Sequence, residues 1–345
     1  SNLCVTANQR VVSDRGLLTV GDLYEQGGEL ILFDNKKEVE SSKMQLIEED
    51  AEVFRITLGN GMKHEITPDH KVLVIESGSE KMVACKDLSL GDKVAIQTQK
   101  GIFGGLNKEK EAFLLGLYQS DGTQHKDLIM FDVWENDFDL LDEIQKSHDY
   151  VCDEYETQVA SNNRVYDNPS FSNCTPSENG VKKRRLTGKA CKKALNFEKG
   201  YVPNWIWESD EATQWQYLKG LLYADGTAFM SSSKGNPLQI SYTDINKGFL
   251  EELQILFANL GLQSSLRIMR EAGPTLLPDG KGGSKFYNTK EAWRIIVGNK
   301  PDGLAIEKKT GFLSRKGITI EDRPYHNNTK KSYEVVAIEE IENQD

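Results

Sequence analysis

The first hundred residues alternate apolar and polar positions in short runs, a pattern typical of β-strands. Ala51–Leu58 alternates, Gly59–Gly61 supplies residues for a tight turn, and Met62–Thr67 continues in extended character. Lys71–Ile75 and Leu88–Val94 add further short extended runs. The pattern therefore predicts an all-β opening that is rich in hairpins.

The pattern changes after the glycine-rich stretch Gly101–Gly105, which predicts a hinge and a domain boundary near residue 101. Helical spacing with interspersed strands follows from Lys108 to about Gly317. Lys330–Glu342 then returns to an alternating, extended pattern. We expect this last strand to pair with the opening β region, so that the middle of the chain is an insertion.

The insertion contains an internal repeat. Phe113–Thr123 (FLLGLYQSDGT) and Tyr217–Thr227 (YLKGLLYADGT) share six of eleven residues and lie 104 residues apart. Each copy predicts an apolar helix with a glycine in its interior, where glycine costs about 1 kcal/mol relative to alanine. Close packing of the two helices would compensate for that cost. Gly122 and Gly226 are expected to cap these helices in the left-handed conformation.

Each repeat ends in an aspartate, Asp121 or Asp225. A carboxylate in the last turn of a helix faces the negative end of the helix dipole, which is unfavourable. If the helices pack side by side, the two carboxylates converge and need a proton or a cation between them. Oxygen ligands of this kind favour Mg²⁺, which supports phosphodiester hydrolysis. The alternative is a pair of Asp-Gly turns that merely end helices.

Composition limits the class of protein. The chain has 345 residues, 38% hydrophobic and 28% charged, which is a globular mixture of two or three domains. It has no signal-peptide pattern and no apolar stretch of about 20 residues, so we expect a soluble, cytoplasmic protein without membrane contact. Five cysteines without a CxxC pair indicate neither a disulfide framework nor a zinc knuckle.

A net charge of −11 argues against a polyanionic partner, but the charge is segregated. Residues 101–160 carry 14 acidic and 4 basic residues, whereas residues 181–200 carry eight basic residues and one acidic residue. Such a basic block is expected of a surface that contacts phosphates. A solvated face is the alternative. The candidate DNA-binding residues are Lys182, Lys183, Arg184, Arg185, Lys189, Lys192 and Lys193.

Leu114–Gly122 (LLGLYQSDG) and Leu218–Gly226 (LKGLLYADG) resemble the two LAGLIDADG motifs of homing endonucleases. The resemblance implies a monomeric α+β domain, a pseudo-twofold αββαββα repeat whose saddle-shaped sheets lie over the DNA major groove. It also implies that Asp121 and Asp225 bind the metal and that basic residues lie near the scissile phosphates. For that role Lys300 is the first candidate, and Lys189, Lys192 and Lys193 compete with it in the first half. The motifs depart from the family at Tyr118, Gln119, Ser120 and Lys219.

A second resemblance concerns the β region. Cys4, followed by Thr67 and His70 in a Thr-x-x-His element and then by LSLGDKV, resembles the N-terminal splicing motifs of inteins. Inteins share the all-β, horseshoe-shaped Hint fold with Hedgehog autoprocessing domains. The resemblance implies a metal-free N-to-S acyl shift, in which Cys4 attacks the Leu3 carbonyl, His70 protonates the leaving amide, and Thr67 helps to hold the oxyanion.

The two resemblances together predict a multidomain chain, an all-β Hint splicing domain with an inserted endonuclease. The expected parts are an N-extein remnant at 1–3, the first part of the splicing domain at 4–101, the endonuclease at 102–325 (halves about 106–200 and 201–320), and a return strand at 326–345. The ending EIENQD lacks the C-terminal splicing motifs of inteins. We therefore expect ligation to need a C-terminal intein fragment.

The expected partners are the double-stranded DNA of the intein-free host gene and the flanking exteins. Asn2-Leu3-Cys4 is similar to the Asn-Leu-Cys around an active-site cysteine of class I ribonucleotide reductase large subunits, which implies a reductase as host. Two alternatives stay open at this point: a homing endonuclease with a non-functional splicing relic, and a DNA-binding module without nuclease activity.

Overall fold

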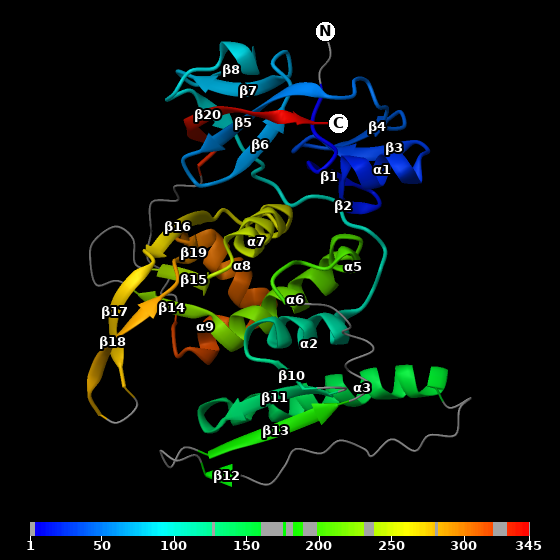
Figure 1. The fold of residues 1–345 in the computed structure, drawn as a ribbon. Helices are drawn as coiled ribbons and strands as arrows, with labels where there is room; N and C mark the ends of the chain where they lie inside the picture. Colours follow the sequence, from blue (N-terminus) through cyan, green and yellow to red (C-terminus); the bar gives the residue numbers. More distant parts are fainter. Residues whose placement is uncertain are drawn as a thin grey trace.

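The two ends of the chain build one antiparallel sheet at the top of the molecule (Figure 1). The computed structural model describes residues 4–125, 128–159, 175–176, 182–188, 199–230, 238–279, 282–319 and 330–344. The sheet has the order β6-β5-β20-β9-β7-β8. Its strands are β5 (Ala51–Leu58), β6 (Lys63–Ile66), β7 (Lys71–Glu76), β8 (Ser79–Ala84), β9 (Lys93–Ala95) and β20 (Ser332–Gln344), and the short helix η1 (Cys85–Asp87) precedes β9.

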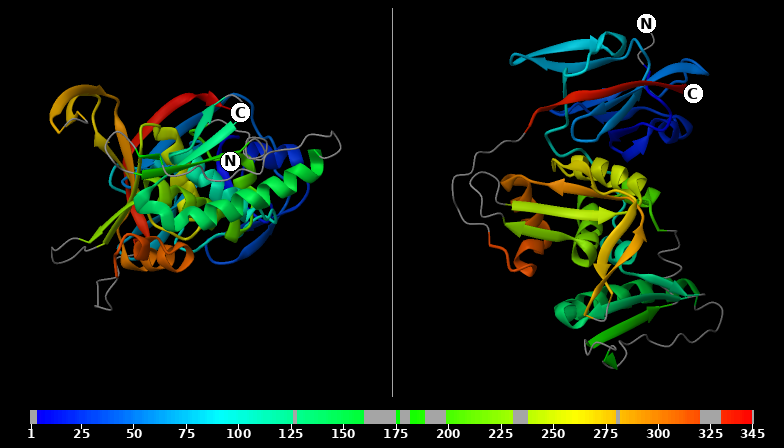
Figure 2. Two further views of the ribbon diagram at one scale, coloured as in Figure 1. Left: turned by 90° about the horizontal axis from the view of Figure 1, so that it is seen from below. Right: turned by 60° about the vertical axis from the view of Figure 1, so that its left-hand side comes forward.

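The last strand, β20, lies inside this sheet rather than at its edge (Figure 2, right). Ile338 pairs with Ile56 of β5, and Tyr333 pairs with Val94 of β9, which is the pairing that the alternating pattern near the end of the sequence predicts. Apolar side chains from both ends, including Val335, form a small core of their own. A strand from the far end of the chain thus completes the β domain.

A second, four-stranded sheet, in the order β2-β1-β3-β4, shares its core with the inserted region. Leu17, Leu18 and Leu23 belong to the same buried cluster as Trp207 of the insert. Gly16 has a φ of +115°, and a Cβ there would lie 2.2 Å from the Trp207 carbonyl oxygen, so only glycine fits. The elements are β1 (Arg10–Ser13), β2 (Gly16–Thr19), α1 (Val20–Gln26), β3 (Leu30–Phe33) and β4 (Glu38–Ser41).

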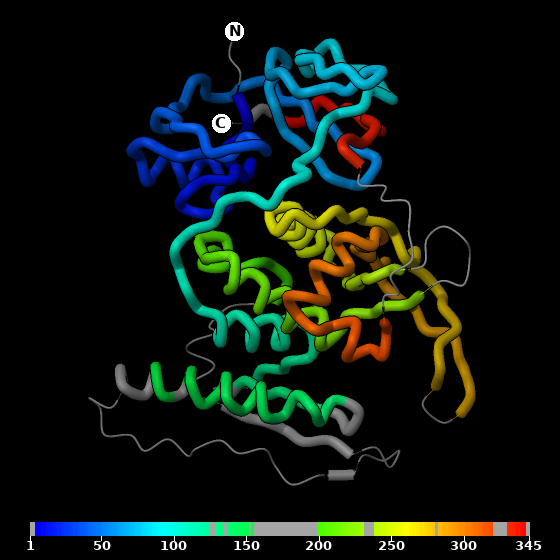
Figure 3. Tube along the Cα trace, turned by 180° about the vertical axis from the view of Figure 1, so that it is seen from behind, coloured from blue at the N-terminus to red at the C-terminus, as the bar shows by residue number. Residues whose placement is uncertain are grey.

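The inserted region leaves the β domain after β9, along a segment on the outside of the molecule (Figure 3), and consists of two similar halves. The sheets have the orders β10-β11-β13-β12 and β14-β15-β19-β16, so each places its fourth strand between its second and third. The first half contains α2 (Glu109–Ser120), β10 (Thr123–His125), β11 (Leu128–Trp134), η2 (Glu135–Leu140), α3 (Leu141–Val159), β12 (Thr175–Pro176) and β13 (Lys182–Gly188).

The second half repeats this order and adds a projecting hairpin, β17–β18, that extends away from the body (Figure 1). Its elements are α5 (Asn204–Trp207), α6 (Glu211–Asp225), β14 (Thr227–Met230), β15 (Leu238–Asp244), α7 (Lys247–Asn259), β16 (Ser265–Arg270), β17 (Gly273–Pro278), β18 (Ser284–Thr289), β19 (Ala292–Val297), α8 (Lys300–Thr310) and α9 (Phe312–Arg315). Within the described residues, no helix is long and apolar enough to cross a membrane.

Helices α2 and α6 form the centre of the insert and cross at their interior glycines. A Cβ on Gly116 would lie 2.3 Å from the Tyr217 carbonyl oxygen, and a Cβ on Gly220 would lie 2.3 Å from the Phe113 carbonyl oxygen. Most side chains around both helices are buried, as expected for helices covered on all sides. Glycine at the crossing therefore allows contact between the two backbones.

The prediction that Gly122 and Gly226 end these helices in the left-handed conformation is wrong. Gly226 is extended, with a φ of −66° and a ψ of 138°, and neither glycine has a positive φ. A Cβ on Gly226 would lie 2.3 Å from the Leu222 carbonyl oxygen, and one on Gly122 would lie 2.6 Å from the Tyr118 Cα. These glycines are needed because the chain turns back closely over its own helix.

Candidate functional site

Asp121 and Asp225 occupy equivalent positions at the ends of the crossed helices. Asp121 is the C-cap of α2, and Asp225 is the last residue of α6. The negative charge of Asp121 raises the pKa of Asp225, and both carboxylates act on the ammonium group of Lys199. The paired helices thus bring the two repeated acids into one electrostatic site with a lysine.

The protonation equilibria at this site are shifted. Burial, followed by the charges of Asp121 and Asp244, raises the pKa of Asp225 to about 6. Burial is also the main cause that raises the pKa of Asp121 and lowers that of Lys199. Both aspartates are open to solvent on one side, which screens part of the charge interaction. Both acids therefore take up a proton more readily than an ordinary aspartate.

Hydrogen bonds fix the lysine beside the first motif. The Lys199 ammonium donates to the Ser120 carbonyl oxygen at 3.1 Å and lies 5.0 Å from the centre of the Tyr118 ring. The Ser120 hydroxyl is 2.8 Å from the hydroxyl of Tyr242 on β15, which ties the end of α2 to the sheet of the second half. Lys199 thus contacts the end of α2, and Ser120 links this end to the second half.

A pocket opens beside Asp121, between the helices and the first sheet. Apolar side chains such as Leu117 and Phe131 line it together with the acids Asp132 and Asp137. Within the residues that the structure describes, no group of three or more His, Cys, Asp or Glu residues is arranged to hold a metal ion. Two carboxylates nevertheless suit Mg²⁺, which usually keeps several water molecules and binds substrate phosphates besides one or two carboxylates.

We expect Asp225→Asn to stabilise the fold at neutral pH but not in acid. Because the pKa of Asp225 is raised from 3.8 to about 6, the native chain holds a proton there that the unfolded chain releases. Stability contributed by this group therefore falls as the pH rises from about 4 to about 6. Thermal unfolding should show a higher melting temperature for the variant at about pH 7.5 and equal values at about pH 4.

A lower melting temperature of Asp225→Asn at neutral pH would contradict this pKa. Asp142→Asn is the matched control, since it removes one negative charge from an exposed position on α3. Because a carboxylate in the first turn of a helix is stabilising, this variant should lower the melting temperature slightly at neutral pH rather than raise it.

The lysines whose charges act on Asp225 are Lys199 and Lys316. The sequence had indicated Lys300, which is the first residue of α8 next to its cap Asn299, and a catalytic role for Lys300 stays a prediction. Lys199, Lys316, Asp244 and Tyr242 were missed. Lys199 had one signal, its position two residues before YVPNWIWE (Tyr201–Glu208), a segment that precedes the second motif.

The predicted basic cluster falls on strand β13 and on the residues after it. In the register of the first sheet, Arg184 pairs with Val133 and Arg185 pairs with Asp132 of β11. Lys182 pairs with Pro176 and Lys183 pairs with Thr175 of β12. Lys189, Lys192 and Lys193 lie outside the described residues. The structure thus places four of the seven predicted phosphate contacts on a strand.

The sheet of the second half presents a polar, basic row on its outer face. Thr243, Arg294 and Arg267 are register partners on β15, β19 and β16. Arg294 Nε donates to the Thr243 hydroxyl at 3.1 Å, and Arg267 is exposed. This arrangement can supply hydrogen-bond donors to an anionic polymer that lies across the strands.

A separate site lies in the β domain, where Cys4 contacts the end of β6. The backbone N–H of Cys4 donates to the Thr67 hydroxyl at 3.2 Å, and the backbone N–H of Thr67 donates to the Cys4 carbonyl oxygen at 3.1 Å. The backbone N–H of His70 donates to the Thr67 carbonyl oxygen at 3.0 Å. The three residues that the sequence had singled out are therefore connected through Thr67.

The surroundings of Cys4 favour the protonated form of its thiol. Burial, followed by the negative charge of Glu48, raises the pKa of the Cys4 thiol. Because the thiolate is the nucleophilic form, an attack by Cys4 needs a group that accepts its proton.

Comparison with known proteins gives matches to both parts of the chain. Residues 212–299 match the family model of the LAGLIDADG-like domain. The chain is 27% identical over 313 residues to the ribonucleoside-diphosphate reductase NrdEB subunit alpha of Bacillus subtilis (strain 168), covering 86% of this chain and 29% of that protein. It is 23% identical to the ribonucleoside-diphosphate reductase large subunit of Invertebrate iridescent virus 6, covering 98% and 33%. The chain spans a third or less of the length of these relatives.

Among solved structures, the PabCDC21-1 intein is 18% identical and matches over 31% of this chain and 76% of that chain. The TM-score of 0.22 is too low to establish a shared fold. The chain therefore contains a LAGLIDADG-like region, and this region lies in an insert that separates β9 from β20 of one sheet.

Proposed function

We propose that the inserted domain is a homing endonuclease that cuts both strands of DNA in the intein-free copy of its host gene. The observation that carries this proposal is the convergence of Asp121 and Asp225 at the ends of two crossed helices, where the charge of Lys199 acts on both. The similarity to two ribonucleoside-diphosphate reductases supports a reductase gene as the host.

In this mechanism Asp121 and Asp225 would hold Mg²⁺ through their carboxylate oxygens. Mg²⁺ supplies stabilisation of the charge on the phosphate and lowers the pKa of water. Lys199, whose pKa is lowered, places a positive charge beside the phosphodiester and exchanges a proton with the attacking water more readily than an ordinary lysine. The hydrogen bond between Ser120 and Tyr242 keeps the two halves aligned around the phosphate.

The two sheets bind the DNA duplex on either side of this centre. Arg267 and Arg294 on the second sheet contact phosphates or base edges, and the strand that carries Lys182–Arg185 does so in the first half. Phosphate contacts from these residues offset the overall negative charge of the chain.

Incubation with Mg²⁺ and a DNA fragment that spans the intein-free host gene tests this function. The expected result is one discrete double-strand break that EDTA prevents. Binding of the fragment without a break would instead favour a DNA-binding module that lacks nuclease activity.

We infer that the β domain carries out the first step of protein splicing. The Cys4 sulfur attacks the Leu3 carbonyl carbon, a carbon–sulfur bond forms, the Leu3–Cys4 amide bond breaks, and the thiol proton ends on the freed amine. The hydrogen bonds between Cys4 and Thr67 hold the Cys4 backbone at the end of β6, and His70 passes the thiol proton to the leaving nitrogen. The step uses no metal.

Treatment of the chain with dithiothreitol is expected to release the tripeptide Ser1–Leu3, detected by mass spectrometry. Cys4→Ala should abolish the release completely, whereas Cys85→Ala, which removes a buried thiol, should not. A wild-type chain that stays intact while its DNA cleavage is preserved would identify the β domain as a non-functional splicing relic.

A further inference from the structure

The turn between β5 and β6 is docked into the inserted domain. Asn60 is buried, and its carbonyl oxygen accepts hydrogen bonds from the Leu266 backbone N–H at 2.8 Å and from the Gln254 side chain at 2.9 Å. Gly61, with a φ of +94°, packs so closely that a Cβ there would lie 3.0 Å from the Leu266 Cβ. The tip of this hairpin therefore contacts residues of α7 and β16 rather than solvent.

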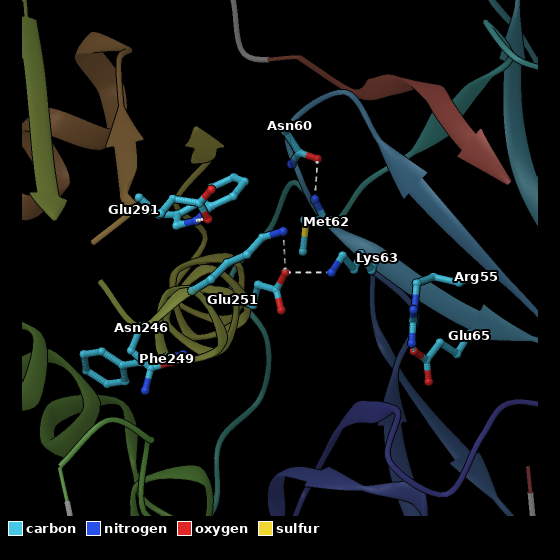
Figure 4. Close-up of polar contacts among 11 residues, drawn as sticks. Arg55, Asn60, Met62, Lys63, Glu65, Asn246, Phe249, Glu251 and Glu291 are labelled. Carbon is cyan, nitrogen blue, oxygen red and sulfur yellow. Dashed lines mark hydrogen bonds and ion pairs between the residues drawn. The ribbon is translucent and has the colours of Figure 1, made fainter. Parts of the chain in front are cut away.

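An ion pair reinforces the docking two residues further along the hairpin. Figure 4 shows Lys63, at the start of β6, and Glu251, on α7, pointing toward each other across the boundary between the two domains. Their charged atoms are 2.8 Å apart, and each side chain is about one-third exposed. Lys247 lies 3.9 Å from the same carboxylate.

Strand β6 connects this docked turn directly to the reactive cysteine. β6 is an edge strand of its sheet, with β5 on one side. On its other side Val5 forms a bridge with Ile66, and the Thr6 backbone N–H donates to the Glu65 carbonyl oxygen at 3.3 Å. The residue after β6 is Thr67, which binds both the N–H and the carbonyl oxygen of Cys4.

We propose that the inserted domain positions Cys4 for the acyl shift, through the docked Asn60–Gly61 turn and the ion pair between Lys63 and Glu251. A displacement of the turn moves β6, and β6 carries Thr67. Lys63 and Glu251 are positioning residues that contact no reacting atom. The inference rests on the splicing function proposed above, and its physical part, the constraint on β6, can be measured separately.

The test is a charge swap. Lys63→Glu places two carboxylates opposite each other and should slow the dithiothreitol-dependent release of Ser1–Leu3 by about three- to tenfold, in proportion to the energy of partly exposed ion pairs. The double variant Lys63→Glu/Glu251→Lys should restore most of the rate. Lys309→Glu is the matched control, because it breaks a similarly exposed pair with Glu211 that lies within the insert.

Hydrogen exchange provides a second readout that does not depend on splicing. Peptides that cover residues 60–70 should exchange several-fold faster in Lys63→Glu than in the wild type or in Lys309→Glu, and the charge swap should reverse the difference. Unchanged release and exchange in Lys63→Glu, or a failure of the swap to restore them, would overturn the inference. If the wild type releases no tripeptide but exchange responds as expected, the splicing function is wrong while the positional coupling holds.

Discussion

Asp225→Asn is expected to lower the rate of DNA cleavage by about a thousandfold or more, with DNA binding retained. The amide keeps the size of the side chain but removes the negative charge, so the proposed Mg²⁺ site would lose one of its two carboxylates. A factor of a thousand corresponds to about 4 kcal/mol of transition-state stabilisation, which is the order expected from a metal that stabilises charge at phosphorus. Asp121→Asn should lower the cleavage rate by a similar factor, because Asp121 occupies the same position in the first repeat as Asp225 does in the second.

Cleavage kinetics under single-turnover conditions and a gel-shift assay in Ca²⁺ measure these two properties. Removing a negative charge near the phosphates should leave the affinity for DNA equal or higher. Asp142→Asn, on the exposed side of α3, should cut at the wild-type rate. Cleavage within a few-fold of the wild type in both Asp121→Asn and Asp225→Asn would refute the proposed metal site.

Gly220→Ala is expected to destabilise the inserted domain by about 3 kcal/mol, because a single methyl group must be placed between two backbones. Its Cβ would lie 2.3 Å from the Phe113 carbonyl oxygen and 2.9 Å from the Gly116 Cα. Neither atom belongs to a flexible side chain, so α2 and α6 must move apart. The same displacement separates Asp121 from Asp225, and cleavage should fall together with stability.

Urea unfolding followed by circular dichroism measures the stability loss. Gly248→Ala is the matched control, since Gly248 also lies in a helix but its Cβ would meet nothing closer than 3.5 Å. That substitution should be neutral or stabilising by up to about 1 kcal/mol, owing to the higher helix propensity of alanine. A similar loss in both variants would mean that the helix crossing is not the cause.

The repeated helices were predictable from sequence because identical spacing of leucine, glycine and aspartate occurs twice. The central position of α2 and α6 and the opening hairpin of β5 and β6 follow from local patterns in the same way. The conformation of Gly226 could not be predicted from the sequence. A close approach to Leu222 and a left-handed turn both require glycine, so the residue type fits either one. Sequence alone does not distinguish the two causes.

Contacts between distant segments were the part that the sequence could not show. Lys199 reaches Ser120 across 79 positions, and Lys63 meets Glu251 from another domain. The residues around a lysine in the sequence look the same whether or not its side chain has a partner in a distant segment. Only the tertiary arrangement indicates which of the many lysines in the chain has a partner.

The points where the chain leaves and re-enters the upper sheet are neighbours. Ser332 pairs with Ala95, and the Ile96 backbone N–H donates to the Lys331 carbonyl oxygen at 3.0 Å. If the residues between these two points were deleted, a tight loop could therefore connect β9 to β20, and the hydrogen bonds between the two strands would be kept. The shortened protein would need polar residues at Leu17, Leu18 and Leu23, which now pack against the insert. It would also need new hydrogen-bond partners for the turn at Asn60.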